Sequence, residues 1–121
     1  MKTGTMQIEI QSYDFSLTDA LRDHTERRLR FTLARVANRI RRITVQLFDI
    51  NGPRGGIDKC CRIQVRLNGL DGVVIEDTEA NVYLAIDRAV DRVGRTAMRR
   101  LARHNARPRG DPVAPGTLMD R

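Results

Sequence analysis

A chain of 121 residues that is 40% hydrophobic has room for one domain with a single modest core. Its formal net charge is +7 at pH 7, and no apolar run approaches the roughly 18–20 residues that a membrane-spanning helix needs. The first residues lack the apolar core of a secretory signal, and two adjacent cysteines make no disulfide framework. We therefore expect a soluble cytoplasmic protein.

The first predicted elements are a strand and a helix. Met6, Ile8 and Ile10 alternate with polar residues, which is typical of a strand with one buried face. A helix is predicted over about residues 19–37, because its apolar positions recur every three or four residues. Thr18 stands directly before this pattern and is the expected N-cap.

Three further strands and a second helix follow. Apolar residues alternate over 43–47 and 61–67, and a turn signal at 67–72 leads to a short fourth strand over 73–76. The last element is a long helix from about 78 to 104, whose apolar positions again step by three and four.

The order strand–helix–three strands–helix predicts an α+β fold for residues 1–105. Each strand has one apolar face, and both helices are amphipathic. We therefore expect both helices to pack on one face of a four-stranded, antiparallel-rich sheet and to leave the other face wet. Residues 106–121 are rich in proline and glycine and have little to bury, so we predict a disordered tail.

The stretch FDINGPRGGIDKCC, residues 48–61, has the composition of a phosphate-binding loop. Such a loop needs a helix N-terminus after it, whereas a strand pattern follows here. The stretch is instead interpreted as a hairpin connection. Cys60 and Cys61 are consecutive in the returning strand and point to opposite faces, so we expect Cys61 in the core and Cys60 half exposed.

No catalytic or metal-binding set is visible. The histidines, His24 and His104, lie near opposite ends of different predicted helices, and a zinc site needs about four converging ligands. No serine or cysteine is paired with a base. We expect no enzyme, no cofactor and no metal, and we interpret His24 as a surface residue of its helix. An enzyme that uses the cysteines is the disfavoured alternative.

Basic charge is concentrated in two blocks. Residues 22–42 carry eight arginines against two acids, and residues 88–109 carry eight arginines against one acid. The intervening residues 43–87 carry four basic and seven acidic side chains. Such segregation is typical of a protein that binds a polyanion, most often nucleic acid.

In the second helix, five arginines step by four, three, four and four positions and so form one stripe away from the core. They are Arg88, Arg92, Arg95, Arg99 and Arg103. Arg100 extends the charge. The five aromatic residues show no stacking platform in the sequence, so we expect phosphate contacts with structured RNA and not readout of single-stranded bases. A merely solvated face and an anionic membrane surface are the alternatives.

The ordered set of elements resembles the ribosome hibernation-promoting factors, the family that includes the ribosome-associated inhibitor of translation and the sigma-54 modulation proteins. The resemblance covers about residues 6–104. It is carried by LTDALRDHTERRL at the first helix and NVYLAIDRAVDRV at the second. The most specific match is YLAID, residues 83–87, followed by Arg92 and Arg95.

This resemblance implies a double-stranded-RNA-binding-domain-like fold and a translational regulator that docks on small-subunit rRNA, inhibits translation and promotes ribosome hibernation under stress. We expect no DNA, membrane or small-molecule partner. The chain is similar to the short members, so we expect no C-terminal dimerisation domain. By position, the resemblance implies RNA contacts from Arg22, Arg28, Arg92, Arg95 and Arg99.

The charge pattern adds Arg88, Arg100 and Arg103 to the predicted RNA-binding residues. Arg54 and Lys59 are candidate peripheral contacts on an exposed hairpin loop. The alternative function is a regulatory protein–protein module on the same fold, without ribosome binding, that uses the polar sheet face. That face is predicted to be lined by Gln7, Glu9, Thr44, Gln46, Arg62, Gln64 and Arg66.

Overall fold

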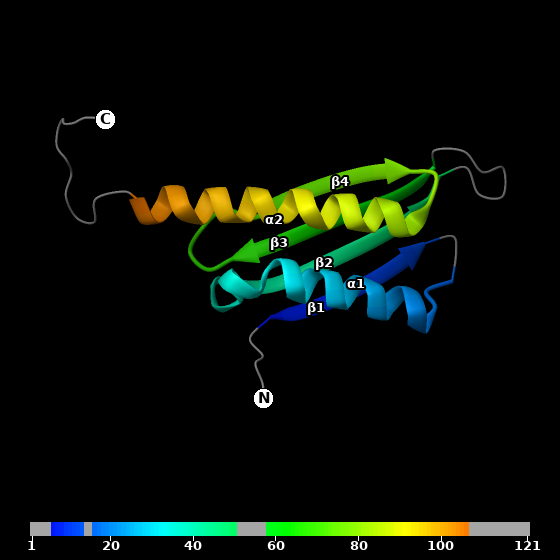
Figure 1. Ribbon diagram of the computed structural model, residues 1–121, viewed down its shortest axis with the longest axis horizontal. Helices are drawn as coiled ribbons and strands as arrows, with labels where there is room; N and C mark the ends of the chain where they lie inside the picture. The colour runs from blue at the N-terminus through cyan, green and yellow to red at the C-terminus, as the bar shows by residue number, and fades with distance from the viewer. Residues whose placement is uncertain (1–5, 14–15, 51–57, 107–121) are drawn as a thin grey trace.

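Within residues 6–13, 16–50 and 58–106, which this computed structural model describes, the predicted α+β fold is confirmed. In these residues a four-stranded sheet carries two α-helices on one of its faces (Figure 1). The elements in chain order are β1 (Gln7–Tyr13), α1 (Asp19–Thr32), η1 (a 3-10 helix, Ala34–Arg39), β2 (Ile40–Asp49), β3 (Lys59–Leu67), β4 (Val73–Glu79) and α2 (Val82–Ala106). The predicted disordered tail lies outside the described residues.

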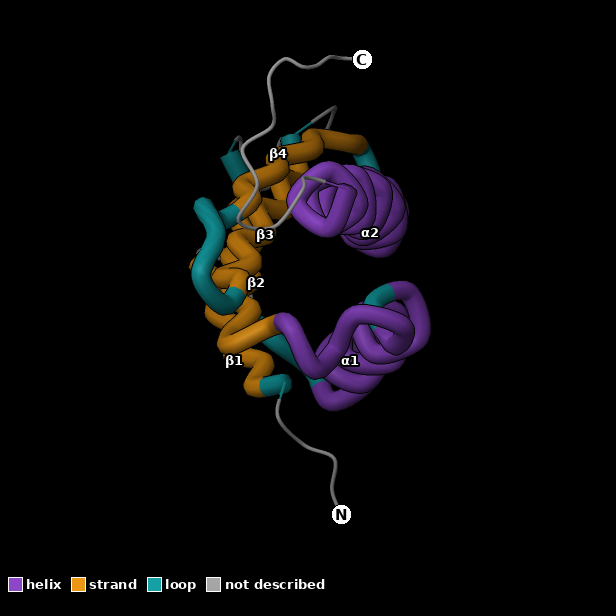
Figure 2. Tube along the Cα trace, turned by 90° about the vertical axis from the view of Figure 1, so that its left-hand side faces the viewer, coloured by secondary structure: helices purple, strands orange, loops and turns teal. Residues whose placement is uncertain are grey.

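The sheet has the order β1-β2-β3-β4, with β1 parallel to β2 and the other neighbours antiparallel. Since parallel neighbours need a crossover connection, α1 and η1 carry the chain from β1 to β2 over one face. α2 returns over the same face and packs on β3 and β4 (Figure 2). Among the described residues, the other face of the sheet is therefore left without a helix.

The core lies between the sheet and the helices. Every second residue of β2 and β3 points inward and is buried, as the alternation predicted. One stripe of each helix closes the core from the other side. Burial of an aliphatic side chain contributes about 1.5–3 kcal/mol relative to exposure, so this burial is the main force that holds the helices on the sheet. The largest fully buried side chains include Leu29, Leu33, Ile40, Ile43, Leu47, Ile63 and Ile86.

α1 begins where the sequence predicted but ends earlier. The Thr18 hydroxyl accepts a hydrogen bond from the Leu21 N–H at 3.1 Å, which confirms Thr18 as the N-cap. The helix stops at Thr32, and the chain tightens into η1 with Val36 at φ −120° and ψ 15°. Thr32 lies against α2 at Gly94, where a Cβ would be only 2.5 Å from the threonine methyl group. Apolar spacing does not distinguish the last α-helical turn from a following 3-10 turn, so the predicted helix was too long.

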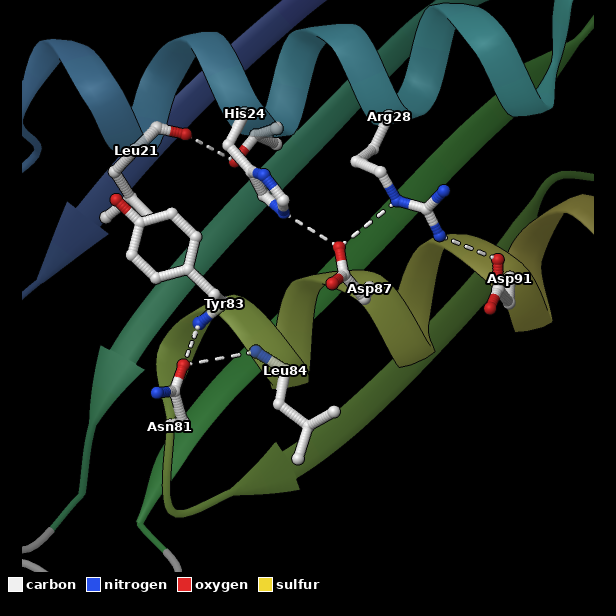
Figure 3. Close-up of polar contacts among 9 residues, drawn as sticks. Leu21, His24, Arg28, Asn81, Tyr83, Leu84, Asp87 and Asp91 are labelled. Atoms are coloured by element: carbon white, nitrogen blue, oxygen red, sulfur yellow. Dashed lines mark hydrogen bonds and ion pairs between the residues drawn. The ribbon is translucent and has the colours of Figure 1, made fainter.

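The boundary between β4 and α2 also differs from the prediction. Thr78, which was predicted to open the last helix, belongs to β4 and pairs with β3. The cap of α2 is Asn81, whose side-chain oxygen accepts hydrogen bonds from the N–H groups of Tyr83 and Leu84 at 2.8 and 3.3 Å (Figure 3). This Asn satisfies backbone donors that no helical carbonyl reaches, and so it sets the start of the helix.

β2 and β3 pair as the predicted antiparallel hairpin. The Ile50 N–H donates to the Asp58 carbonyl at 2.9 Å, at the point where the glycine-rich connection begins and ends. Residues 51–57 lie outside the described residues, so the predictions about their turns and about Arg54 stay predictions. The element after the connection is a strand, as the sequence indicated, and a phosphate-binding loop would need a helix there.

The two cysteines lie on opposite faces of the sheet, as predicted. Cys61 is in the core, but the prediction for Cys60 was wrong, because only 5% of this residue is exposed. Phe48 and Thr78 flank Cys60 in register on the outer face and cover it. Burial raises the pKa of both thiols, which makes them poor nucleophiles at neutral pH.

Two further site types are not found within residues 6–13, 16–50 and 58–106. No group of histidine, cysteine, aspartate or glutamate side chains there is arranged to hold a metal ion. Neither helix of this part of the chain has an apolar stretch long enough to cross a membrane.

Candidate nucleic-acid interface

The face of α2 opposite the core carries the α2 ridge, defined by Arg88, Arg92, Arg95, Arg99 and Arg103. On the core side of the same helix, residues such as Ile86 and Val93 are completely buried. All members of the ridge are exposed. At about 100° per residue, their spacing places them within about 80° of the helix circumference. The predicted stripe therefore presents a row of guanidinium groups to solvent.

The N-terminal part of the ridge is tied to the edge strand β4. Arg92 donates from Nη1 to the Glu76 carbonyl at 2.9 Å and lies 3.5 Å from the Asp77 carboxylate. Arg88 lies 3.5 Å from the Glu79 carboxylate. The side-chain hydrogen bond with Asp77 is the main cause that raises the pKa of Glu79, and burial raises it further. These contacts join α2 to β4, so Arg88 and Arg92 stabilise the packing of the helix on the sheet.

Arg100, which the charge pattern had added to the predicted RNA-binding residues, holds the turn between β3 and β4. Its Nη1 donates to the Gly72 carbonyl at 2.6 Å and to the Asp71 carbonyl at 3.3 Å. The turn itself depends on Gly69, whose φ of 71° is a left-handed conformation that favours glycine. The Arg100 side chain is thus directed at the backbone of the turn and away from the ridge.

The C-terminal part of the ridge differs, because its arginines are not used inside the described part of the protein. Arg95, Arg99 and Arg103 are exposed, and none has a hydrogen-bond or ion-pair partner among the described residues. Each step of four residues advances about 6 Å along a helix that rises 1.5 Å per residue. Each guanidinium keeps five N–H donors for an outside acceptor, in a planar arrangement that suits phosphate.

On α1, the partly exposed side chain of Arg28 contacts the second helix. Its Nε lies 3.1 Å from the Asp87 carboxylate, and its Nη2 lies 2.9 Å from that of Asp91 (Figure 3). His24 makes a 2.7 Å hydrogen bond to the same Asp87 oxygen, and its ring meets the edge of Tyr83 with centroids 4.9 Å apart. We call these five residues the helix clasp. The prediction that His24 is a plain surface residue was wrong, because its side chain is only 25% exposed and joins two helices.

The spacing of the helix clasp residues was visible in the sequence and could have been used to predict the helix clasp. His24 and Arg28 are four residues apart and so share one face of α1, and Asp87 and Asp91 have the same spacing on α2. Two acids on an otherwise basic helix are unusual, and a basic pair of equal spacing is their natural partner. What the sequence could not show was that these two faces meet.

Arg22 is the other predicted RNA-binding residue of α1, and the fold does not bring it together with the other predicted RNA-binding residues. It lies about 120° around the helix from Arg28, at about 100° per residue. Arg22 is exposed and has no partner among the described residues. Arg27 and Arg30 share both properties, although the prediction did not select them.

Lys59, the described member of the two peripheral candidates, lies in β3 and not on an exposed loop. Its Nζ is 2.9 Å from the Asp58 carboxylate and 3.2 Å from that of Asp49, and its side chain is 23% exposed. The hydrogen bond to Asp58 is the main cause that raises the pKa of Lys59. The amine is therefore occupied by two internal carboxylates, which corrects the predicted setting of this residue.

Comparison with known proteins adds a family and two structural neighbours. A family model described as "Sigma 54 modulation protein / S30EA ribosomal protein" matches residues 8–107. The N-terminal domain of Protein Y from Thermus thermophilus is similar, with 31% identity, a TM-score of 0.64 and coverage of 78% of this chain and 98% of that one. A comparison with curated protein sequences gives no match.

A second solved structure is similar in fold. It is a ribosomal subunit interface protein from Coxiella burnetii, with a TM-score of 0.60, 19% identity and coverage of 84% of this chain and 100% of that one. At this identity the likeness concerns the fold alone. This chain thus covers nearly the full length of both neighbours.

Proposed function

Because this chain belongs to the sigma-54 modulation protein / S30EA ribosomal protein family, we propose that it docks on small-subunit rRNA, inhibits translation and promotes ribosome hibernation. Family membership makes it a ribosome-associated protein; the rRNA contact and the inhibition are the proposal. In this account the protein acts in the cytoplasm by occupying a site, without catalysis. It takes no cofactor, and DNA, membranes and small molecules are not its partners.

The observation that supports this function is the unpartnered half of the α2 ridge. Arg95, Arg99 and Arg103 align on one exposed face and have no hydrogen-bond or ion-pair partner among the described residues. Like charges at this spacing destabilise a helix by a few tenths of a kcal/mol per pair, so the arrangement is unfavourable for folding alone. A phosphate backbone turns that repulsion into several charge-assisted hydrogen bonds.

The remaining predicted residues take a supporting part in the proposal. Arg88, Arg92 and Arg100 fix the angle and position of α2 on the sheet through β4 and its turn. Arg28 joins α1 to α2 through the helix clasp. These contacts hold the ridge rigid, so that an incoming phosphate backbone meets guanidinium groups that are already aligned. Arg22 lies on the far flank of α1 and would touch RNA only at the margin.

The first test is sedimentation of the full chain with ribosomes. We expect the protein to move with the small subunit or the whole ribosome through a sucrose gradient at low salt. Binding should weaken steeply as salt rises, since each phosphate contact contributes a slope of about −0.9 in log K against log salt. A protein that stays at the top of the gradient at low salt contradicts the proposal.

The second test concerns inhibition. Added at one copy per ribosome to a cell-free translation reaction, the protein should lower the synthesis of a reporter from the first round of initiation. The same reaction at high magnesium and raised salt gives the control, because docking that depends on ion release weakens there. Binding without any loss of synthesis would leave a ribosome-associated protein but remove the inhibitory function.

A further inference from the structure

The outer face of the sheet, opposite α1 and α2, forms a second surface with its own chemistry (Figure 2). Each strand presents every second residue to this face, and the register aligns these residues in rows across the sheet. The row at one end is basic, and the row at the other end is aromatic. The two rows between them carry amide, hydroxyl, charged and apolar side chains: Glu9, Thr44, Gln64 and Val74 in one, and Gln11, Gln46, Arg62 and Glu76 in the other.

At the basic end, two arginines of neighbouring strands face each other. Arg42 of β2 is directly in register with Arg66 of β3, and like charges placed so are destabilising. The nearest carboxylate is that of Glu9, which is 3.9 Å from Arg42. The described lining of the shallow hollow at this place contains no carboxylate. It consists of Gln7, Arg41, Arg42, Thr44, Gln64 and Arg66.

At the aromatic end, two rings that are distant in the sequence stack on each other. Tyr13 of β1 is in register with Phe48 of β2, and their rings are nearly parallel at 12° with centroids 5.0 Å apart. The Tyr13 hydroxyl donates to the Gln11 side chain at 2.8 Å, which holds the ring in place. Tyr13 is 40% exposed and Phe48 is half-buried beneath it. The expectation that the aromatic residues form no stacking unit is therefore wrong for this pair.

Two amide side chains of this face are not used internally, Gln64 in its middle and Gln7 in the row of Arg42 and Arg66. Both are exposed and have no partner among the described residues, whereas Gln11 and Gln46 in the middle are already hydrogen-bonded to each other. Arg62 is exposed as well and is in register with Glu76. From Arg42 to Phe48 the strand advances six residues, or about 20 Å at 3.3 Å per residue. Sheets of this size bind single strands elsewhere by stacking two or three bases on aromatic side chains.

We propose that the outer face of the sheet binds a short segment of single-stranded RNA, separately from the α2 ridge. A base stacks on the exposed side of Tyr13, and Phe48 positions that ring. Phosphates lie at the other end, on Arg41, Arg42 and Arg66. The inference rests on the proposed function only in that docking on the ribosome would bring the protein close to RNA. The sheet face itself is separate from the α2 ridge, because the sheet and the helices form opposite sides of the domain.

Single-stranded RNA fits this face better than an acidic protein segment. An acidic segment would use the arginines but would leave the aromatic pair and the unpaired amides without a role. A nucleotide has all three complementary parts, because its base has a π face and polar edges and its phosphate is an anion.

The test is fluorescence anisotropy of the full chain with a labelled single-stranded RNA of eight nucleotides and mixed sequence. We expect the double variant Arg42→Gln/Arg66→Gln and the variant Tyr13→Ala each to weaken binding about tenfold, in line with the loss of one stacking or phosphate contact. Tyr13→Phe keeps the ring and should stay within about twofold of the wild type. The same measurements are repeated in the ridge variant Arg95→Gln/Arg99→Gln/Arg103→Gln, which removes phosphate binding by the ridge, and the tenfold losses from the sheet variants should persist in that background. A thermal melt of each variant shows whether it is folded.

Several outcomes would overturn the inference. The wild-type protein could fail to bind the oligonucleotide, or the ridge variant alone could lose binding while the sheet variants keep it. Tyr13→Phe could lose as much affinity as Tyr13→Ala, which would remove stacking as the contact. The sheet variants could instead bind RNA normally while losing a protein partner in a pull-down. Ribosome sedimentation of the ridge variant reports on the proposed function alone, so failure of one idea is distinguishable from failure of the other.

Discussion

The two halves of α2 carry the same kind of charge and do different things with it. In the N-terminal half, Arg88 and Arg92 bind β4, and Asp87 and Asp91 bind α1. In the C-terminal half, the ridge arginines Arg95, Arg99 and Arg103 have no partner among the described residues. Helical spacing tells which residues share a face. Only the neighbouring elements decide whether a charge is used inside the protein or is presented to an outside anion.

The largest effect on stability is expected from the helix clasp, in the N-terminal half. Asp87→Ala removes the acceptor shared by His24 and Arg28, and we expect a loss of about 1–2 kcal/mol in the free energy of unfolding, after allowance for partial exposure. For a domain of this size that corresponds to a fall in melting temperature of roughly 4–16 °C. Urea denaturation measures the loss directly.

Asp91→Ala is the matched control for the helix clasp. Asp91 contacts Arg28 alone and its side chain is 54% exposed, so its loss should cost less than about 0.5 kcal/mol. If Asp87→Ala and Asp91→Ala lower the free energy of unfolding equally, the sharing of Asp87 by His24 and Arg28 adds no stability. The account of the N-terminal half would then be incorrect.

A smaller effect should separate two adjacent arginines. Arg100→Ala removes hydrogen bonds to the Gly72 and Asp71 carbonyls and should lower the free energy of unfolding by about 1 kcal/mol. Arg99→Ala, one position away, removes an arginine without a described partner and should leave stability unchanged or slightly higher. If both variants lose equal stability, the distinction between tied and unpartnered arginines fails.

The smallest effect tests whether the unpartnered arginines repel one another. Arg99 has Arg95 four residues before it and Arg103 four residues after it. Arg99→Gln should therefore stabilise the free protein by about 0.5 kcal/mol at low ionic strength. The gain should disappear at roughly 1 M salt, where the screening length falls to about 3 Å. Thermal melts at the two salt concentrations give the comparison, and a gain that persists at high salt would have another cause.

Much of the fold followed from local patterns. The alternation of Ile43, Val45 and Leu47 identified β2 and its inner face, and the Thr18 cap was visible before α1. Helix ends were less accessible. The Asn81 cap is a local feature that apolar spacing does not reveal, because it depends on the side chain before the helix and not on the helix face. The close approach of Thr32 to Gly94 at the end of α1 arises where two helices meet, and a one-dimensional pattern does not contain that information.

The candidate sites show the same division. The spacing of the α2 ridge along one helix was enough to predict an exposed stripe. Its subdivision depends on β4 and α1, since Asp87 lies 63 residues from His24 in the chain. The Tyr13–Phe48 stack depends on a parallel register between β1 and β2 that no local pattern encodes. Surface function was thus predictable where one element supplies it and not where two elements share it.

We propose that the unpartnered half of α2 holds the protein on the ribosome, and two triple variants that remove equal charge provide a direct test. Arg95→Gln/Arg99→Gln/Arg103→Gln is compared with Arg27→Gln/Arg30→Gln/Arg35→Gln, which removes equal charge from exposed arginines outside the ridge. In sedimentation with small subunits, the ridge variant should bind on the order of 100-fold more weakly, from about 1 kcal/mol per lost contact. The control variant should stay within a few fold of the wild type. Equal weakening of both variants, or full binding by the ridge variant, would contradict the account.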